Sequence, residues 1–464
     1  MAKATVYVRK LNTEHQRESM TKFLPLSESI VCEIKKNVKE IFDLAGGAAL
    51  LKLSGDVYIK PNGIDAKPYC YVRPEVIDAV MCYWFDAGAK NVYLFENSTQ
   101  CNFTRLVFET VGYTRICRQT GAQPIYLDED KRVLFTFGDG DGDESYTRNT
   151  FEMPQMVKEK LIDHKDENLY IDVPKLKTHS MAGVTLGIKN QWAFPRQNDR
   201  RSDHNHLLAS KLADVLKLVR PDFTLIEGVE GTIYGHYPVT ALADKCVIPF
   251  MTLIGSANVL AADIVGAKVF GLELAEVDHL RIAAERGLGD GVHSLEDIEI
   301  DGDIPRFTKK YPTDLYNSYP KDVNVVMGKK RCCKQGCQNN PLTLLQVLYH
   351  DYGGTGGWDM VMGEGHDLDV IDKLKGPVLI AGYCAINEVG DRLIKRLGKR
   401  HVYQSGYCND LTASAAAMFR LMKVNPLALV DLPPLQAAWL LILAKLHGSK
   451  ANVPALWSKL IKTV

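Results

Sequence analysis

Residues 56–95 read DVYIKPNGIDAKPYCYVRPEVIDAVMCYWFDAGAKNVYLF. The stretch opens on an apolar strand pattern at Asp56–Lys60 and closes on another at Asn91–Phe95. Between them, residues 74–88 place apolar side chains at helical spacing, and Gly88 is a typical helix end. A strand, a helix and a strand in this order predict two parallel strands joined by a crossover helix.

The same alternation extends over most of the chain. Further strand patterns lie at 122–127, 169–173, 224–226 and 248–254, and helix patterns end near Gly112 and cover 206–218 and 259–270. A second series begins after residues 303–322, which hold three prolines and few apolar runs. Its strands are expected at 323–327, 358–362, 377–381 and 401–404, and its helices at 341–352, 370–374, 385–397 and 412–423.

The two series predict an α/β protein with two doubly wound, mostly parallel sheets and a short helical C-terminal tail. The first domain covers residues 1–302, with an N-terminal helical extension at 1–50. Residues 303–322 form the linker, 323–424 a cysteine-bearing Rossmann-like domain, and 425–464 an apolar helical tail.

The composition fits a globular protein of more than one domain. The 464 residues are 46% hydrophobic and 24% charged, an ordinary balance, and roughly 150 residues per domain suggests two or three domains. Lys+Arg and Asp+Glu are equal at 56 each. Since a nucleic-acid-binding protein usually carries a basic excess or stripe, we expect no nucleic-acid partner.

Signals for secretion or membrane spanning are missing from the sequence pattern. The opening MAKATVYVRKLNTEHQRESM lacks the apolar core of a signal peptide. The apolar segment 435–446 would rise only about 18 Å as a helix, against about 30 Å of hydrocarbon in a bilayer. We therefore expect a cytoplasmic protein whose tail docks on protein or on a lipid surface.

Lysines and histidines follow the predicted strands of the first domain where each strand ends. They lie in KPN at 60–62, KLKTH at 175–179 and TLGIKN at 185–190, with two more histidines at 204 and 206. Carboxyl ends of parallel strands meet at one edge of a sheet, where such folds bind ligands. Lysine supplies positive charge and histidine transfers protons, so the cluster indicates a small carboxylate or phosphate substrate; the alternative is solvated loop residues. We predict catalytic roles for Lys177, His179 and Lys189, and substrate binding by Lys60, Asn62, Lys175, Asn190 and His204.

Cysteines are concentrated in the second domain. The chain has eleven, an odd number that argues against a secreted disulfide scaffold. Three predicted strands of one parallel sheet each deliver cysteine to the same edge. The five candidate ligands are Cys332, Cys333, Cys337, Cys384 and Cys408.

Thiolate ligands select iron–sulfur clusters or zinc. The spacing contains no CxxC pair, which argues against a zinc ribbon, and it resembles enzymes that hold a [4Fe–4S] cluster on single cysteines from separate strand ends. Zinc and unliganded buried thiols are the alternatives. One of Cys332 and Cys333 is surplus to a four-cysteine site, and the sequence does not decide which.

Residues 50–295 resemble the family called domain of unknown function 362. The likeness rests on KPN, RPEVIDAVMCYWFDAGAKNVYLFEN, VPKLKTH, TLGIKN and SANVLAADIVGAKVFG. Family members are often joined to ferredoxin-type iron–sulfur modules, and the resemblance implies no particular activity. This chain departs from the pattern by lacking a CxxCxxC module and by carrying Asn258 where the family commonly has aspartate.

A shorter segment looks like part of the nickel-pincer lactate racemases. His179, followed by Ala182 and Gly183 and then by Lys189, is similar to their proton-transfer histidine and cofactor-carrying lysine. His204 or His206 would then correspond to their downstream nickel ligand. Nickel is therefore a further, less favoured cofactor.

These patterns together predict an iron–sulfur oxidoreductase or lyase, of a kind found in anaerobic metabolism, acting on a small anionic substrate. A ferredoxin-like electron donor and a homodimer are compatible with this hypothesis. The alternatives are a racemase or epimerase with structural cysteines, and a non-catalytic carrier of a metal or cluster.

Overall fold

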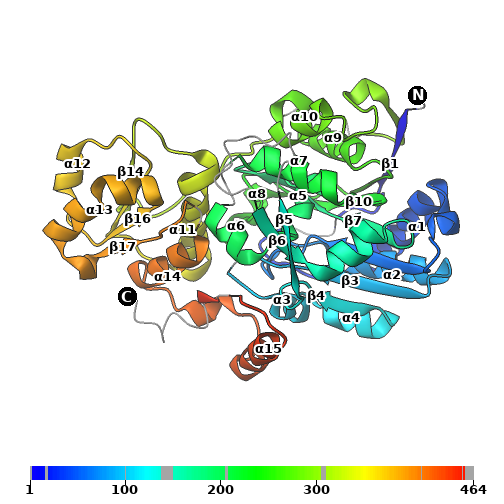
Figure 1. Ribbon diagram of the computed structural model, residues 1–464, viewed down its shortest axis with the longest axis horizontal. Coiled ribbons are helices and arrows are strands. Elements are labelled where there is room, and N and C mark those ends of the chain that lie inside the picture. Colours follow the sequence, from blue (N-terminus) through cyan, green and yellow to red (C-terminus); the bar gives the residue numbers. More distant parts are fainter. Residues whose placement is uncertain are drawn as a thin grey trace.

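The computed structural model describes residues 3–15, 19–99, 101–136, 150–203, 207–304, 310–408, 410–451 and 453–454. Within these ranges the chain forms two α/β domains that lie side by side, with the C-terminal helix α15 (Pro434–Leu446) below the first (Figure 1). The predicted fold class is confirmed.

The first domain is built on a large, mostly parallel sheet. Strands β4, β3, β2, β7 and β10 are mutually parallel neighbours, whereas β12 runs antiparallel to both β10 and β1. The main order is β13 (Ile298–Asp301), β1 (Ala4–Lys10), β12 (Thr252–Ser256), β10 (Phe223–Thr232), β7 (Leu169–Val173), β2 (Asp56–Pro61), β3 (Asn91–Glu96) and β4 (Gln123–Tyr126). The short strands β8 (Lys175–His179), β9 (Gly183–Val184) and β11 (Val247–Ile248) extend it, and β5 (Arg132–Thr136) pairs separately with β6 (Thr150–Pro154).

The strand–helix–strand unit predicted from residues 56–95 is confirmed as β2, α2 (Pro74–Asp86) and β3. Proline at the first position of α2 is compatible with a helix start because that N–H has no helical partner. Gly88 adopts a positive φ of 97°, which favours glycine and stops the helix. The two strands pair in parallel, with Val57 opposite Val92.

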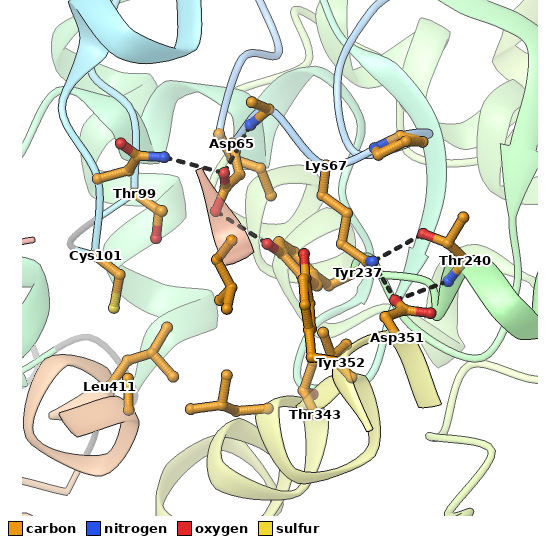
Figure 2. Close-up of a pocket in the computed structure, with 18 of the residues that line it drawn as sticks. Asp65, Lys67, Thr99, Cys101, Tyr237, Thr240, Thr343, Asp351, Tyr352 and Leu411 are labelled. Carbon is orange, nitrogen blue, oxygen red and sulfur yellow. Dashed lines mark hydrogen bonds and ion pairs between the residues drawn. The ribbon is translucent and has the colours of Figure 1, made fainter. Parts of the chain in front are cut away.

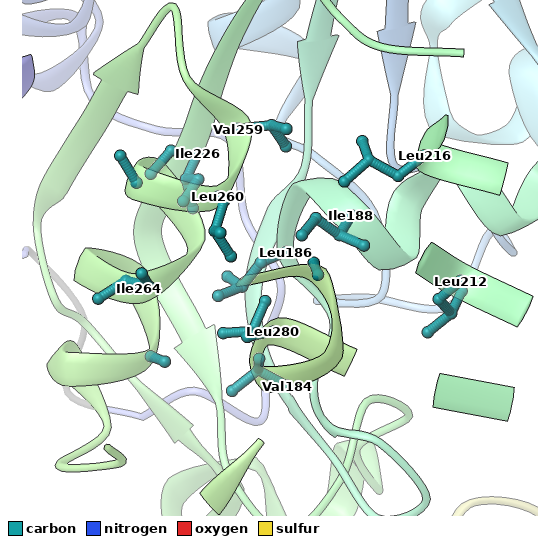
Figure 3. Packing of buried hydrophobic residues seen from close by; sticks show 14 of the residues in the cluster. Val184, Leu186, Ile188, Leu212, Leu216, Ile226, Val259, Leu260, Ile264 and Leu280 are labelled. Carbon is teal, nitrogen blue, oxygen red and sulfur yellow. The ribbon is translucent and has the colours of Figure 1, made fainter. Parts of the chain in front are cut away.

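Helices cover both faces of the large sheet and bury a core on each. One face packs against α1 (Glu28–Leu44), α2, α3 (Thr104–Val111) and α4 (Tyr113–Thr120). The other packs against α5 (Leu186–Asn190), α7 (Leu208–Leu218), α9 (Val259–Val269) and α10 (Asp278–Glu285). Figure 3 shows the second core, where Leu186 and Ile188 of α5 lie among Val259, Leu260 and Leu280. The remaining helices of this domain are α6 (Gln197–Asp203) and α8 (Ala243–Cys246).

The second domain is a four-stranded, all-parallel sheet. Its order is β14 (Asn324–Met327), β15 (Asp359–Met362), β16 (Val378–Ala381) and β17 (Val402–Gln404). Alternate residues of β15 point to opposite faces: Met360 and Met362 pack with α11 (Asn339–Tyr352) and α14 (Leu411–Leu421), and Val361 with α12 (Leu368–Lys373) and α13 (Tyr383–Leu397). All four predicted strands are therefore present.

The structure differs from the sequence prediction at the N-terminus. Residues 4–10 form a strand rather than part of a helical extension, because Val6 and Val8 alternate into the core between β12 and β13. The described part of the linker packs back on the first domain, where the Tyr311 N–H donates to the Phe270 carbonyl at 2.9 Å.

Helix α15 docks on the first domain. Ala437, Leu441 and Ala444 pack against Phe103 and Leu106 at the start of α3. Over the described residues, each helix is too short or too polar to cross a bilayer.

Candidate functional site

Three sequence motifs meet in one hydrogen-bond chain at the carboxyl edge of the large sheet. The Lys177 ammonium, from β8, donates to Asn62 Oδ1 at 2.6 Å, just beyond β2. Asn62 Nδ2 donates to Asn190 Oδ1 at 3.1 Å, and Asn190 Nδ2 donates to Asp172 Oδ1 of β7 at 2.7 Å. All four side chains are buried, so the chain fixes their orientations and connects KPN, KLKTH and TLGIKN.

A cavity of about 110 Å³ opens beside this chain. Five of the residues predicted from the sequence line it, namely Asn62, Lys177, His179, Lys189 and Asn190. The other polar lining comes from Glu96, Asn97, Thr99, Thr185, Arg200, His236 and Asn340. The size suits a small molecule or a head group.

Two cations that line the cavity, Lys189 and Arg200, have hydrogen-bond donors without an acceptor among the described residues. Lys189 has neither a hydrogen bond nor an ion pair within the described ranges, and burial, followed by the charges of neighbouring cations, lowers its pKa to about 7. Arg200 donates to the Ser98 carbonyl at 2.8 Å, but its buried Nε–H finds no acceptor in the part of the chain that the structure describes. Burial likewise lowers the pKa of Lys177 to about 8. A buried donor without an acceptor is costly, so the cavity is suited to an anion.

Other predicted cations lie elsewhere. Lys60 forms a buried ion pair with Glu96 at 3.1 Å, and Lys175 forms one with Glu227 at 2.5 Å. Neither lysine lines the cavity. Both point into the fold because a buried carboxylate there neutralises them. The predicted residue His204, and His206 beside it, lie outside the described residues.

His179 is held in one tautomeric form. Its Nδ1 accepts from the backbone N–H groups of Met181 at 3.1 Å and Ala182 at 3.2 Å. The neutral ring therefore carries its proton on Nε2. The ring stacks on His236 with centroids 3.9 Å apart and planes 7° apart, so both imidazoles lie on one side of the cavity.

Asp263 positions Lys189 indirectly, by holding the start of the helix α5 that carries it. Its carboxylate accepts from the N–H groups of Gly187 at 2.7 Å and Ile188 at 2.8 Å, at the start of the short helix α5. Space is tight there, because a methyl group on Gly187 would stand 2.7 Å from a Val259 methyl. The carboxylate of Asp263, on α9, therefore fixes the start of α5 against the core. Asn258, the departure from the family pattern, caps α9 by accepting from the Ala261 N–H at 3.0 Å.

The five candidate cysteines lie at the carboxyl edge of the second sheet, in the segments that follow β14, β16 and β17; Cys384 is in the first turn of α13 and Cys337 in a short helical turn before α11. A methyl group on Gly382, which directly follows β16, would stand 3.1 Å from Cys337 Cβ and 3.7 Å from Cys408 Cα. Cys332 lies beside Gly363, just after β15, at a corresponding 3.0 Å. Each cysteine is a free thiol.

Electrostatic coupling also links these thiols. The pKa of Cys408 is raised by burial and then by Cys384 and Cys337. Arg331 donates from Nε to Cys333 Sγ at 3.2 Å and its charge acts on Cys384 too. Within the described ranges, no three His, Cys, Asp or Glu side chains surround one point as the ligands of a single ion would; cluster thiolates each bind a different iron and stand farther apart.

The cysteine edge faces the cationic cavity. Asn339, two residues after Cys337, donates from Nδ2 to the carbonyl of Ser180, the neighbour of His179, at 2.7 Å. Asn340 and Leu411, each three residues beyond a candidate cysteine, line the cavity itself. The second domain therefore forms one wall of the pocket in the first.

Sequence reasoning missed Arg200, His236 and Glu96. Glu96 ends β3 and His236 follows β10, so the strand-end argument would have found both had it been applied to every strand. Arg200 lies in α6, within the polar run RQNDRRSD, where no periodicity marks it as buried.

Comparisons with known proteins bear on the first domain. Residues 57–268 match the family described as Domain of unknown function (DUF362). A thylakoid-associated protein, sll1697, of Synechocystis sp. (strain ATCC 27184 / PCC 6803 / Kazusa) is 25% identical over 270 residues, covering 54% of this chain and 74% of the relative. A crystal structure of a Thermotoga maritima protein aligns with a TM-score of 0.37 at 11% identity, over 85% of this chain and 83% of the other. The matched region contains β2, β7, β8 and α5, which carry the hydrogen-bond chain. Residues 57–268, which include most of the first domain, are therefore similar to the DUF362 family.

Proposed function

We propose that this protein is an iron–sulfur enzyme, an oxidoreductase or a lyase, that acts on a small carboxylate or phosphate. The observation that carries the proposal is the contact of a cysteine-rich sheet edge with a cavity that is lined by the cations Lys177, Lys189 and Arg200. A redox or Lewis-acid group beside an anion pocket is an arrangement for chemistry rather than for storage.

The substrate anion would bind Lys189 and Arg200. Among the described residues the Lys189 ammonium has no hydrogen bond and the Arg200 Nε–H has no acceptor, so an anionic oxygen would satisfy donors that the fold leaves open. Lys177 contributes charge from a fixed position, since Asn62 and the Cys70 carbonyl hold its ammonium at 2.6 and 2.7 Å.

The donor set of the second domain fits a cluster. Cys337, Cys384 and Cys408, with Cys332 or Cys333, would supply three or four thiolates, and a [4Fe–4S] group bound there would supply electron transfer or an open Lewis-acidic iron. Arg331 would offset part of the negative charge of the thiolates. Zinc remains the alternative occupant and nickel a less favoured one.

His179 is suited to proton transfer in this pocket. Its Nδ1 is occupied by two backbone donors, which places the proton of the neutral ring on Nε2. A racemase needs acid and base groups on opposite faces of its substrate, whereas His179 and His236 stack on one face. This stacking favours the iron–sulfur hypothesis over the racemase alternative, and the substrate-sized pocket favours it over a carrier.

A cytoplasmic location and a ferredoxin-like electron donor belong to the same proposal, as does a homodimer. The relative named as thylakoid-associated adds a peripheral membrane location as a further hypothesis for this chain.

Anaerobic purification followed by iron, sulfide, nickel and zinc analysis tests the cofactor. We expect roughly four irons and four sulfides per chain for a [4Fe–4S] cluster, with broad absorbance in the violet and blue. Cys384→Ser and Cys408→Ser should each lose most of the iron.

Cys32→Ser is the matched control, because Cys32 is an exposed thiol on α1 of the other domain. Iron that stays at full occupancy in the Cys384→Ser, Cys408→Ser double variant would refute the cluster site. If the protein instead contains a stoichiometric amount of zinc and no iron, the cysteines form a structural zinc site rather than a cluster site.

A further inference from the structure

A second and larger cavity, of about 500 Å³, lies between the two domains (Figure 2). Its apolar wall comes from α3, α11, α14 and the C-terminal tail. Its apolar lining includes Leu106, Leu344, Leu411, Ala415 and Phe419. A cavity of this size and lining is typical of a binding site for an organic ligand.

Asp65, Lys67 and Asp351, three of the charged groups that line this cavity, are already held by other side chains. Asp65 accepts from the Tyr237 hydroxyl at 3.0 Å, the Ala66 N–H at 2.7 Å and Asn102 Nδ2 at 3.2 Å. Lys67 forms an ion pair with Asp351 and donates to the Thr240 hydroxyl at 2.9 Å (Figure 2). A ligand in this cavity would therefore contact mainly apolar side chains.

The two cavities adjoin. Ile64, Thr99, His236, Asn340 and Leu411 line both of them. A ligand anchored at Lys189 and Arg200 in the smaller cavity can thus continue past His236 into the larger one. The smaller cavity provides cationic hydrogen-bond donors that have no acceptor among the described residues, and the larger cavity provides an apolar wall.

We infer that the two cavities together bind an amphiphilic anion. One carboxylate or phosphate would lie at Lys189 and Arg200, and an apolar chain or ring system would fill the space between the domains. The inference rests on the proposed anion site and names the class of its substrate. Burying an apolar body there would add affinity at about 0.8 kcal/mol per methylene group, which a short anion cannot gain.

Titration calorimetry of the full-length protein with acetate, octanoate and dodecanoate tests this inference. We expect affinity to rise by roughly fourfold per added methylene until the larger cavity is filled. Ala415→Phe, which adds a ring on α14 in the apolar wall, should abolish that gain and leave acetate and inorganic phosphate binding unchanged.

Two controls separate the possible failures. Ala416→Phe places the same ring on the next residue of α14, which does not line the cavity, and should keep the chain-length dependence. Lys189→Met should weaken every member of the series, because it removes the anchoring charge.

The outcomes distinguish the inference from the function on which it rests. If acetate and phosphate bind in a Lys189-dependent way but longer chains bind no better, the amphiphile is excluded and the small-anion site stands. If no anion of the series binds, the anion site itself fails. A chain-length gain that Ala415→Phe leaves intact would place the apolar body elsewhere and overturn the inference.

Discussion

Lys189 controls the charge of the smaller cavity. With a pKa of about 7 it is charged below that pH and neutral above it, and Lys177 follows at about 8. Anion affinity should therefore fall as pH rises through 7 to 8. Since a bound anion favours the ammonium, binding near pH 7.5 should take up a proton, measurable by calorimetry in buffers of different ionisation enthalpy.

Lys189→Met removes the titrating ammonium of Lys189 and keeps a side chain of similar length. In the free protein the depressed pKa means that the unfolded chain binds more protons between pH 7 and about 10.5, so this group raises stability as pH rises through that window. The variant should lose the proton uptake and this part of the pH dependence. Unchanged proton uptake would show that another group titrates with the anion.

Only one cysteine of the adjacent pair Cys332 and Cys333 is needed as the fourth ligand of a four-cysteine cluster. Cys333 accepts from Arg331 and is coupled electrostatically to Cys384 and Cys408. We expect Cys333 to be the fourth ligand, so Cys333→Ser should lose iron and Cys332→Ser should retain most of it. The reverse result from iron analysis of the two variants would assign the ligand to Cys332.

Residue-level prediction succeeded where position along a strand decided the outcome. Asn62, Lys177, His179, Lys189 and Asn190 all reach one cavity because carboxyl ends of parallel strands converge. Lys60 and Lys175 do not line the cavity, because each forms an ion pair with a buried glutamate, Glu96 or Glu227. These glutamates lie far from the lysines in the sequence, so the local pattern did not predict the pairing. A pattern around a lysine does not contain the residue that will neutralise it.

At the scale of elements, α15 offers a clean comparison between two faces of one helix. Leu441 is 6% exposed and packs on α3, whereas Trp439 is 57% exposed. Leu441→Asp should release the helix and lower the thermal midpoint, because it buries a charge without a partner. Trp439→Asp should change the midpoint little, and limited proteolysis should cut only the first variant within the tail.

Deleting residues 435–464 extends this test. Loss of the contact with Phe103 and Leu106 should destabilise the first domain, while the protein should remain in the soluble fraction of cell extracts both before and after the deletion. A full-length protein that pellets with membranes, and is freed by the deletion, would show instead that the exposed stripe of Leu435, Trp439 and Leu446 binds lipid.

Element prediction depended on how strongly a local pattern repeats. The four strands of the second domain are short, mostly apolar runs, and α2 carries apolar side chains at helical spacing; their positions are confirmed. Strand β1 was missed because ATVYVRK has only two fully buried positions, Val6 and Val8, flanked by polar residues. The strand predicted at 248–254 divides into β11 and β12 at Pro249, since proline donates no hydrogen bond to a ladder.

At the scale of the whole molecule, the position of the domains relative to each other had no signal in the sequence. The contacts that fix it join residues far apart, such as Asn339 with Ser180 and Asp351 with Lys67. Each is a single polar pair without a repeating pattern. The cavity shared by the domains follows from these contacts, so the sequence predicted its cationic wall but not its apolar one.

The Lys67–Asp351 pair joins the domains beside the larger cavity. Both side chains are buried, and Asp351 also accepts from the N–H groups of Thr240 at 3.0 Å and Ala241 at 2.9 Å. Asp351→Ala leaves a buried ammonium and two N–H groups without their acceptor. Removing one partner of a buried pair costs about 3–5 kcal/mol, so we expect a large fall in the free energy of unfolding, measured in urea.

Asp163→Ala is the matched control, because Asp163 pairs with Lys158 on the protein surface, and such pairs contribute about 0–1 kcal/mol. Calorimetry should add a second signature. With the interdomain pair broken, the single transition of the parent should separate into two, since each domain has its own core. Equal losses in the two variants would mean that solvent reaches Lys67, and the larger cavity would then be too wet to hold an apolar body.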